Sequence, residues 1–229
     1  MCGRFTLTTD LDRLAERFAF HAADLSYTPR YNIAPSQPVL AVLRETDDGA
    51  PRVELLRWGL IPSWAKDPAI GDRMINARAE TVAEKPSFRR ALQKRRCLVL
   101  ADGFYEWKKE GKKKVPLFIT LKSREPFGFA GLWETWRSST DETLRSCTII
   151  TTTPNTLMES LHNRMPVILP REAEALWLDR TVGDPQTLLP LLSPYPDEAM
   201  EAYIVSSFVN SPRNDTPTCI APLSSLSPA

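Results

Sequence analysis

The chain has 229 residues, of which 42% are hydrophobic, so it is long enough to bury the core of one domain. Its 29 basic and 28 acidic residues give a formal net charge of +1. This balance excludes a protein that is basic over its whole surface, so any nucleic-acid site must be local. No apolar run reaches the roughly 18 residues of a membrane span, and no basic segment followed by an apolar one marks a secretion signal. We therefore expect a cytoplasmic protein without membrane contact.

The cysteine and histidine content argues against a metal centre. The four cysteines, Cys2, Cys97, Cys147 and Cys219, lie far apart, and no two form the Cys-x-x-Cys pair that is typical of zinc sites. A reducing compartment also argues against disulfides. With only 2 histidines in the chain, we predict no metal and no cofactor.

The first predicted element is an amphipathic helix. Thr8 or Thr9 can cap it, because a threonine hydroxyl accepts a hydrogen bond from the first helical turn. Apolar residues then recur at i, i+3, i+4 and i+7, the spacing of one helix face. They are Leu11, Leu14, Ala15 and Phe18. We expect this face to pack against the core.

Strands and a basic helix are predicted over the next part of the chain. Residues 38–44 and 53–58 have the composition of β-strands, with the polar stretch 45–51 between them as a hairpin-type connection. The segment 59–78 is expected to be an ordered loop. A basic helix at 87–96 then precedes a buried strand at 97–101.

A β-hairpin is predicted after the buried strand. Its arms are residues 104–109 and 115–121, and the turn falls at Glu110-Gly111. The lysines at 112–114 are taken as marking the hairpin tip.

The remaining elements are short. A helix at 154–161 follows a Thr153 cap, and Pro170 opens a second helix that runs to Leu178. Further strands are expected at 127–133, 148–152 and 203–207.

Many short strands among helices, without a regular βαβ rhythm, are typical of an α+β fold. We predict one domain, residues 2–220, built around a largely antiparallel, barrel-like β-sheet with flanking short helices. The residues from 210 onward are rich in Pro, Ser and Asn, so no regular structure is expected there, and 221–229 are assigned to an irregular tail.

Cys2 is the first candidate for chemistry. Methionine is normally trimmed before a small residue, which would leave an amine and a thiol on Cys2. The ordinary pKa is about 7.7 to 8.0 for an α-amine and about 8.5 for a thiol, so both groups are partly nucleophilic near neutral pH. An aldehyde, such as that of a ring-opened abasic deoxyribose, would first form an imine, and the thiol would then close a thiazolidine ring. A cysteine at this position can equally be a small hydrophobic residue.

Seven short blocks carry a family resemblance. They begin at Cys2 (CGRF), Tyr31 (YNIAP), Trp58 (WGLIPSW), Ile75 (INARAET), Arg95 (RRC), Gly103 (GFYEW) and His162 (HNRMP). In these blocks the chain resembles the SRAP family, the abasic-site processing proteins first named SOS-response-associated peptidases. The resemblance extends from residue 2 to about residue 220, and it is specific because the blocks occur in the family's order. It implies an SRAP-type domain.

The resemblance implies that three side chains share the chemistry with Cys2. Glu106 falls where the family has its catalytic glutamate, and its aromatic neighbours would desolvate the carboxyl group and favour proton exchange. His162 would act in Schiff-base chemistry and in reversal of the cross-link, and Asn76 would position Cys2 and the sugar. From residue type alone, Glu106 is equally a solvated strand-end residue and His162 a partner of a helix dipole.

DNA contacts are also implied by the resemblance. Guanidinium groups suit phosphates, and an indole face stacks on an unpaired base. A proline would act as a wedge beside the lesion, and a threonine would line the pocket, whereas Trp58 is assigned to the core. The predicted DNA-binding residues are Arg4, Pro35, Trp64, Arg78, Lys85, Trp107, Thr151 and Arg164.

A locally basic stretch leaves two interpretations open. It either extends the phosphate track or is a solvated helix face. Its residues are Lys85, Arg89, Arg90, Lys94, Arg95 and Arg96.

Three functions compete. The first is a monomeric enzyme that captures abasic sites in single-stranded DNA, or at a junction of single and double strand, by lyase-like Schiff-base chemistry that ends in a thiazolidine. The second is an N-terminal-nucleophile cysteine peptidase, including removal of its own Met1. The third is a nucleic-acid module in which Cys2 has no role. The guanidinium groups around one nucleophile favour DNA over a peptide.

Overall fold

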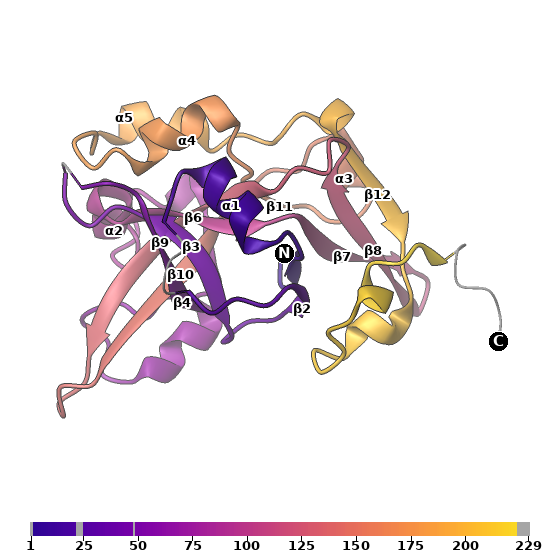
Figure 1. The fold of residues 1–229 in the computed structure, drawn as a ribbon, viewed down its shortest axis with the longest axis horizontal. Coiled ribbons are helices and arrows are strands. Elements are labelled where there is room, and N and C mark those ends of the chain that lie inside the picture. Colours follow the sequence, from indigo (N-terminus) through magenta and orange to yellow (C-terminus); the bar gives the residue numbers. More distant parts are fainter. Residues whose placement is uncertain (1, 22–24, 48, 224–229) are drawn as a thin grey trace.

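The structure, a computed structural model, describes residues 2–21, 25–47 and 49–223. Two β-sheets make up its body, and short helices lie around them (Figure 1). This α+β architecture confirms the predicted fold class. No helix among the described residues is long and apolar enough to cross a membrane.

A closed five-stranded barrel forms the larger part of the molecule. The ring closes because one strand, β9, pairs with both β6 and β10. The β4–β10 pairing is parallel and the other four are antiparallel, so the sheet is largely antiparallel, as predicted. In order around the ring, the strands are β10 (Thr143–Thr152), β4 (Arg52–Trp58), β3 (Pro38–Leu43), β6 (Arg96–Ala101) and β9 (Phe127–Arg137).

Burial on both faces explains the sequences of the central barrel strands. β3 and β6 are buried along almost their whole length. Strands covered on both faces have continuous apolar runs rather than alternating ones. In the Val-Leu-Ala-Val-Leu run of β3 and the Cys-Leu-Val-Leu-Ala run of β6, alternate side chains therefore face the barrel interior, and the others are buried against the elements outside it.

Two short strands pair with the C-terminal half of β10. β5 (Asn76–Arg78) pairs with it in parallel, and β11 (Met165–Pro166) pairs with it antiparallel. Two motifs that lie far apart in the sequence meet here. One contains Asn76, and the other, just before β11, contains His162.

The second sheet holds the N-terminal strand between two others. Its order is β12 (Met200–Ile204), β8 (Lys113–Leu121), β7 (Gly103–Glu110), β1 (Phe5–Leu7) and β2 (Arg30–Ile33). β1 pairs antiparallel with both neighbours, with Phe5 opposite Phe104 on β7 and opposite Ile33 on β2. The chain just before β1 is thereby held beside β7.

An aromatic cluster joins the two sheets. The Phe5 ring centre lies 5.1 Å from that of Trp58 and 5.8 Å from that of Phe129, and Phe104 lies 6.1 Å from Phe129. All four side chains are fully buried. Their edge-to-face contacts link β1 and β7 to the barrel, so the N-terminal strand is fixed against both halves of the core.

Short α-helices flank the sheets, and α4 and α5 lie along one side of the molecule (top of Figure 1). Leu14 and Phe18 of the first helix are buried, as its spacing predicts. Pro170 stands directly before α4, also as predicted. The helices are α1 (Leu11–Phe18), α2 (Arg89–Lys94), α3 (Thr156–Glu159), α4 (Arg171–Leu178) and α5 (Pro185–Leu188).

Two helix caps differ from the prediction. Asp10, not Thr8 or Thr9, caps α1, and its side chain accepts a hydrogen bond from the first turn at 2.9 Å. The two threonine hydroxyls donate instead to Asp102, at 2.9 and 3.0 Å, because this carboxylate comes close only in the folded chain. Asn155 rather than the predicted threonine caps α3.

Several element boundaries also differ. The predicted loop 59–78 contains a 3-10 helix (Pro68–Arg73) and the strand β5. The predicted helix 87–96 is shorter, because Phe88 stands at the N-cap of α2 and Arg95 and Arg96 lie beyond its end. β9 and β10 are longer than predicted, and β12 begins earlier.

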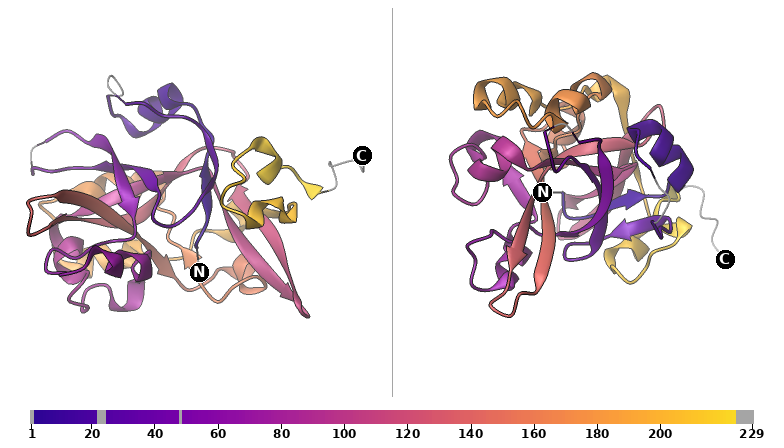
Figure 2. Two further views of the ribbon diagram at one scale, coloured as in Figure 1. Left: turned by 90° about the horizontal axis from the view of Figure 1, so that it is seen from below. Right: turned by 60° about the vertical axis from the view of Figure 1, so that its left-hand side comes forward.

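The C-terminal segment is more ordered than its composition suggests. Residues 207–210 and 217–219 form 3-10 helices that pack against β7 and β8, where Val209 and Cys219 join Tyr105 and Phe118 in a buried cluster. Figure 2 shows this segment, in yellow, alongside the second sheet. Most of the predicted irregular tail, residues 224–229, lies outside the described residues.

The aromatic cluster gives the first prediction. Phe5→Ala should lower the free energy of unfolding by about 3–5 kcal/mol, because it removes a fully buried ring and leaves a cavity between the sheets. Urea unfolding followed by fluorescence measures this change. Phe208→Ala, at a ring that is 41% exposed, is the control and should change stability by less than about 0.5 kcal/mol. Equal losses in the two variants would contradict the role given to Phe5.

Candidate functional site

Cys2 lies buried beside the second sheet, with an exposed fraction of 0%. The backbone N–H of Tyr105 donates to the Arg4 carbonyl at 3.0 Å, so the residues before β1 continue alongside β7. From another direction, Asn76 Nδ2 donates to the Cys2 carbonyl at 2.8 Å. The sheet and the β5 motif therefore hold Cys2 together.

Glu106 lies on β7, is 4% exposed, and acts electrostatically on Cys2. Burial raises the pKa of the Cys2 thiol well above its ordinary value, and the charge of Glu106 raises it further. A hydrogen bond with the Arg4 backbone lowers the thiol pKa, but by less than burial raises it. The thiol is therefore protonated at neutral pH, and a base must take its proton before the sulfur can attack.

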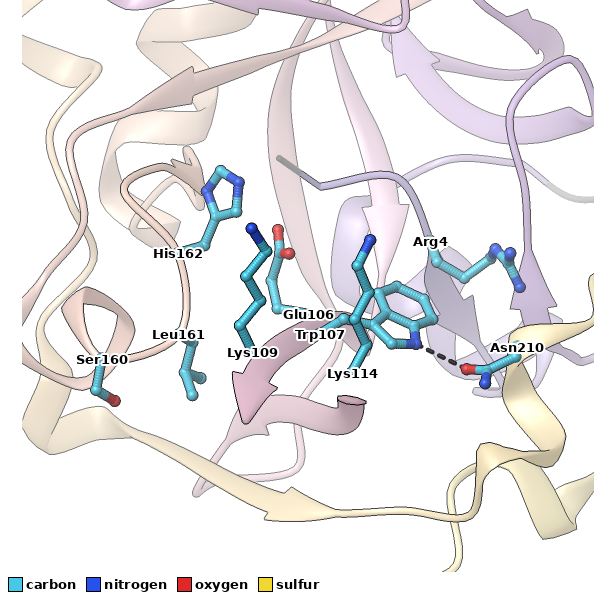
Figure 3. A pocket seen from close by; sticks show the side chains of 9 residues that line it. All are labelled: Arg4, Glu106, Trp107, Lys109, Lys114, Ser160, Leu161, His162 and Asn210. Atoms are coloured by element: carbon cyan, nitrogen blue, oxygen red, sulfur yellow. Dashed lines mark hydrogen bonds between the residues drawn. The ribbon is translucent and has the colours of Figure 1, made fainter. Parts of the chain in front are cut away.

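A pocket of about 790 Å³ opens beside Glu106 (Figure 3). His162 lines the same pocket, so a carboxylate and an imidazole share one hollow. Its size lies within the range of roughly 300 to 1,000 Å³ that is usual for small-ligand pockets. The remaining lining residues are Arg4, Trp107, Lys109, Lys114, Ser160, Leu161 and Asn210.

The His162 ring is oriented by a nearby backbone group. The N–H of Arg164 donates to His162 Nδ1 at 3.0 Å. A neutral imidazole that accepts at Nδ1 carries its proton on Nε2. The alternative role as a helix-dipole partner is not favoured, because α3 is only 4 residues long and Nδ1 accepts rather than donates.

Arg4 and Trp107 form one wall of the pocket. The Arg4 guanidinium lies 5.7 Å from the Trp107 ring centre and donates to Asn32 Oδ1 at 2.6 Å and to the Val209 carbonyl at 3.0 Å. Trp107 Nε1 donates to Asn210 Oδ1 at 2.7 Å. Burial lowers the pKa of Arg4. Both predicted DNA-binding side chains are therefore held in place by the protein itself.

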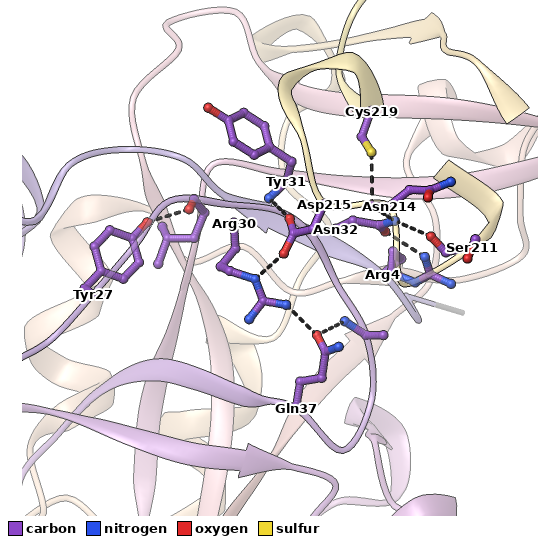
Figure 4. A network of polar contacts seen from close by, with 12 residues as sticks. Arg4, Tyr27, Arg30, Tyr31, Asn32, Gln37, Ser211, Asn214, Asp215 and Cys219 are labelled. Atoms are coloured by element: carbon purple, nitrogen blue, oxygen red, sulfur yellow. Dashed lines mark hydrogen bonds and ion pairs between the residues drawn. The ribbon is translucent and has the colours of Figure 1, made fainter. Parts of the chain in front are cut away.

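Asn32 ties the C-terminal segment to this wall (Figure 4). It is fully buried, and its Nδ2 donates to the carbonyls of Val209 at 3.1 Å, Ser211 at 3.0 Å and Asn214 at 2.6 Å. Asp215 adds a second tie to β2. Sequence reasoning gave Asn32 and Asn210 no role, although the YNIAP block around Asn32 was a signal.

A second hollow, of about 570 Å³, adjoins the β5 motif. Asn76, Arg78 and Lys85 line it together with Arg73, and its lining contains no Asp or Glu. In the described part of the chain, none of the three cations Arg73, Arg78 and Lys85 has an ion-pair partner within 4.0 Å. Because Asn76 also contacts Cys2, this basic hollow adjoins the candidate nucleophile.

Arg164 and Thr151 are engaged within the protein. The Arg164 guanidinium forms a bidentate ion pair with Glu80, at 2.6 and 2.9 Å, and donates to the Thr151 carbonyl at 2.5 Å. The ion pair lowers the pKa of Glu80. Thr151 is fully buried, donates to the Ala77 carbonyl at 3.3 Å, and lines neither hollow. Neither side chain is therefore open to DNA in this arrangement.

The remaining predicted DNA contacts divide by exposure. Trp64 is 60% exposed, as a base-stacking residue should be, whereas Trp58 is fully buried and donates from Nε1 to the Ile75 carbonyl at 2.9 Å. Pro35 is half-buried and precedes Ser36, which has a positive φ of 70°. Trp64 and Pro35 line neither of the two hollows.

The basic stretch is not one continuous surface. Arg96 is 3% exposed and donates to the main-chain carbonyls of Leu92 and Gln93 in α2 and of Trp177 in α4, so it holds the two helices together. Burial lowers the pKa of Arg96 to about 10. Arg95 pairs with Glu134 at 2.6 Å. Within this stretch, Lys85 lies in the basic hollow, whereas Arg96 is removed from any DNA track.

The described residues contain four buried free cysteines and no candidate metal site. Cys97, Cys147 and Cys219 are buried like Cys2, and all four are free thiols. Within residues 2–21, 25–47 and 49–223, no group of 3 or more His, Cys, Asp or Glu side chains could hold a metal ion.

Comparison with known proteins assigns the family. The profile of the SOS response associated peptidase (SRAP) family matches residues 1–212, and the chain belongs to this family. Abasic site processing protein YoqW of Bacillus subtilis is 52% identical over 223 residues, which cover 96% of this chain and 99% of that protein. Abasic site processing protein HMCES of Xenopus tropicalis is 35% identical over 224 residues, which cover 85% of this chain and 66% of that protein.

Solved structures agree with the fold. A crystal structure of a protein from Bacteroides thetaiotaomicron superposes with a TM-score of 0.85 at 30% identity, over 96% of this chain and 99% of that one. A protein from Bordetella bronchiseptica superposes with a TM-score of 0.76 at 28% identity, over 90% of this chain and all of that one. The two-sheet architecture is therefore that of the family.

The buried thiols give the second prediction. Burial raises the pKa values of Cys2, Cys97 and Cys147 above the ordinary thiol value of about 8.5, so above this pH the unfolded chain loses thiol protons that the folded chain keeps. The free energy of unfolding should therefore fall as pH rises past 9, by up to about 1.4 kcal/mol per pH unit for each thiol. Urea unfolding between pH 8 and 10 measures the slope. A Cys97→Ala/Cys147→Ala variant with an unchanged slope would contradict this origin.

Proposed function

We propose that this chain processes abasic sites in DNA by covalent capture. Once Met1 is removed, Cys2 forms a thiazolidine with the ring-opened sugar of a lesion in single-stranded DNA or at a junction of single and double strand. One observation carries the proposal: Asn76 holds Cys2, and the charge that acts on the Cys2 thiol is that of Glu106, which lines a pocket together with His162. The chain's SRAP relatives are named abasic site processing proteins, which supports this substrate.

The reaction needs no oxidant, reductant or cofactor. The Cys2 amine attacks the aldehyde carbon to give a carbinolamine, and loss of water leaves an imine. The Cys2 sulfur then forms a C–S bond to the imine carbon, while the imine nitrogen takes up the proton that the thiol gives up. The sum is aldehyde plus aminothiol giving thiazolidine plus water.

The neighbours of Cys2 suit these steps. Because burial keeps the thiol protonated, Glu106 is proposed as the base that takes the thiol proton as the sulfur attacks and passes it to the imine nitrogen. His162 is proposed as the second proton carrier, through Nε2, in imine formation and in slow reversal. Asn76 Oδ1 is buried and has no hydrogen-bond partner in the described part of the chain, so it is proposed to accept from the new amine or from a sugar hydroxyl.

DNA is proposed to lie across both hollows. Arg4, Arg78 and Lys85 would contact phosphates, while Trp64 and Trp107 would stack on unpaired bases. Pro35 would act as a wedge beside the lesion, whereas Thr151, which is fully buried and lines neither hollow, is not proposed as a contact. We further propose that the protein acts as a monomer in the cytoplasm and associates with the nucleoid when bound to DNA.

Arg164 remains a proposed phosphate ligand with one condition. Its guanidinium is paired with Glu80, so a phosphate can bind it bidentately only by displacing this carboxylate. The same residue orients His162 through its backbone N–H. Arg164 therefore links the proposed phosphate contact to the proposed proton carrier.

The alternative is an N-terminal-nucleophile cysteine peptidase, including removal of its own Met1. The basic hollow beside Asn76 favours a polyanion over a peptide. Turnover of a fluorogenic peptide that depends on Cys2 would favour the peptidase instead. The third function, a non-catalytic nucleic-acid module, would leave Cys2→Ala fully functional.

The third prediction tests the covalent step. The processed protein, mixed with an abasic single-stranded oligonucleotide, should give an adduct that survives heating on a denaturing gel. Cys2→Ala keeps the amine but lacks the thiol, so it should give an adduct only after borohydride reduction of the imine. A protein that retains Met1 should give no heat-stable adduct without reduction, because the Cys2 nitrogen is then part of a peptide bond and cannot close the thiazolidine. A heat-stable adduct of unreduced Cys2→Ala would refute the thiazolidine.

The fourth prediction tests Glu106. Glu106→Gln should slow adduct formation at saturating DNA by about 100-fold, because an amide cannot take the thiol proton. Single-turnover gels measure this rate. Glu110→Gln, at an exposed position on the same strand, is the matched control and should react like the wild type. Equal rates in all three proteins would exclude Glu106 as the base.

A further inference from the structure

The two faces of the β7–β8 hairpin differ in how their charges are compensated. Successive side chains of a strand point to opposite faces, so Lys109 lies on one face with Trp107, and Lys108 and Glu110 lie on the other. In the hairpin register Lys109 is directly opposite Lys114, and Glu110 is directly opposite Lys113. Like charges face each other on one side only.

On the face that carries Lys108, Glu110 and Lys113, called the outer face below, the charges compensate one another. Lys108 Nζ lies 3.6 Å from Glu110 Oε1, and Lys113 is the cross-strand partner of the same carboxylate. Opposite charges at such positions stabilise a hairpin, by roughly 0.2–1 kcal/mol per pair. Lys108, Glu110 and Lys113 therefore need no ligand to balance their charges.

On the opposite face, which carries Trp107, Lys109 and Lys114 and is called the inner face below, the two lysine charges do not compensate each other. The Lys109 and Lys114 side chains are exposed and line the 790 Å³ pocket, and neither side chain has an ion pair or a hydrogen bond in the part of the chain that the structure describes. Two cations directly opposite each other destabilise a hairpin. Only Lys112 lies in the turn, so the assignment of lysines 112–114 to the hairpin tip is wrong for Lys113 and Lys114, which belong to β8.

We propose that Lys109 and Lys114 form a phosphate-binding pair that holds the strand beside the lesion, each lysine contacting one of two consecutive phosphodiester groups. This inference rests on the proposed function. Figure 3 shows both side chains extending from the hairpin into the hollow that holds Glu106 and Arg4. Trp107 lies on the same hairpin face, so a base stacked on its indole brings its phosphate towards the lysines. An anion between the two ammonium groups would turn their repulsion into attraction.

The test measures binding without covalent chemistry. The probe is a single-stranded oligonucleotide with a central tetrahydrofuran residue, an abasic analogue that has no aldehyde, and fluorescence anisotropy gives its affinity from 50 to 300 mM salt. Lys109→Gln/Lys114→Gln should reduce the slope of log affinity against log salt by about 1.4, and weaken binding roughly 10-fold at 0.1 M salt. Lys108→Gln/Lys113→Gln removes the same charge from the outer face, so its slope should change by less than half as much.

A second measurement locates the contact. Oligonucleotides in which one phosphate at a time is replaced by a neutral methylphosphonate should bind wild-type protein more weakly at two consecutive positions near the lesion. The Lys109→Gln/Lys114→Gln variant should show no further loss at those positions, because the partner charge is already gone. Equal slope changes for the inner and outer variants, or losses at the same phosphates in both proteins, would overturn the proposal. Failure of the covalent function would instead appear as a missing adduct in wild-type protein, with these binding differences intact.

Discussion

The position of Cys2 depends on one strand that is paired on both edges. β1 has only 3 residues, yet it lies between β2 and β7 and places Phe5 in the aromatic cluster between the two sheets. An extended chain advances about 3.3 Å per residue, so Cys2 cannot lie more than roughly 10 Å from this anchor. Covalent chemistry needs finer control than that. The hydrogen bonds that Tyr105 makes to the Arg4 carbonyl and Asn76 to the Cys2 carbonyl supply it.

Burial gives Cys2 two opposed properties. The raised thiol pKa keeps the sulfur protonated. It therefore reacts slowly with general oxidants and electrophiles, because these react mainly with thiolates. The same shift makes attack depend on a neighbouring base, and Glu106 is the carboxylate that acts on the thiol. Reactivity then requires both the aldehyde and proton transfer within the pocket. Under the proposed function Cys2 is used once, and this restriction protects it, because an early side reaction would inactivate the protein.

Local patterns predicted most of the fold, and tertiary contacts decided what they missed. The apolar runs of β3 and β6 and the period of α1 are local signals, and these elements form as predicted. The α1 cap differs because the hydroxyls that could cap it bond to Asp102, a residue far along the chain. In the site, the family resemblance predicted that Asn76 positions Cys2, and Asn76 donates to the Cys2 carbonyl while the charge of Glu106 acts on the Cys2 thiol. The pairing of Arg164 with Glu80 and the burial of Thr151 depend on how β5 and β11 meet β10, which no local pattern reveals.

The net charge of +1 hides a separation of charge by location. Carboxylates such as Glu174 and Glu54 pair with arginines away from the two hollows, at 2.8 and 2.5 Å, and so cancel much of the positive charge elsewhere. The hollow beside β5 is lined by Arg73, Arg78 and Lys85 without a carboxylate, and the hollow beside β7 is lined by Lys109 and Lys114 together with Glu106. Non-specific DNA binding grows with the number of phosphates neutralised, so a nearly neutral protein with a short basic track binds undamaged DNA weakly. Under the proposed function, selectivity for a lesion comes from an aldehyde that undamaged DNA lacks, while charge only brings the strand to Cys2.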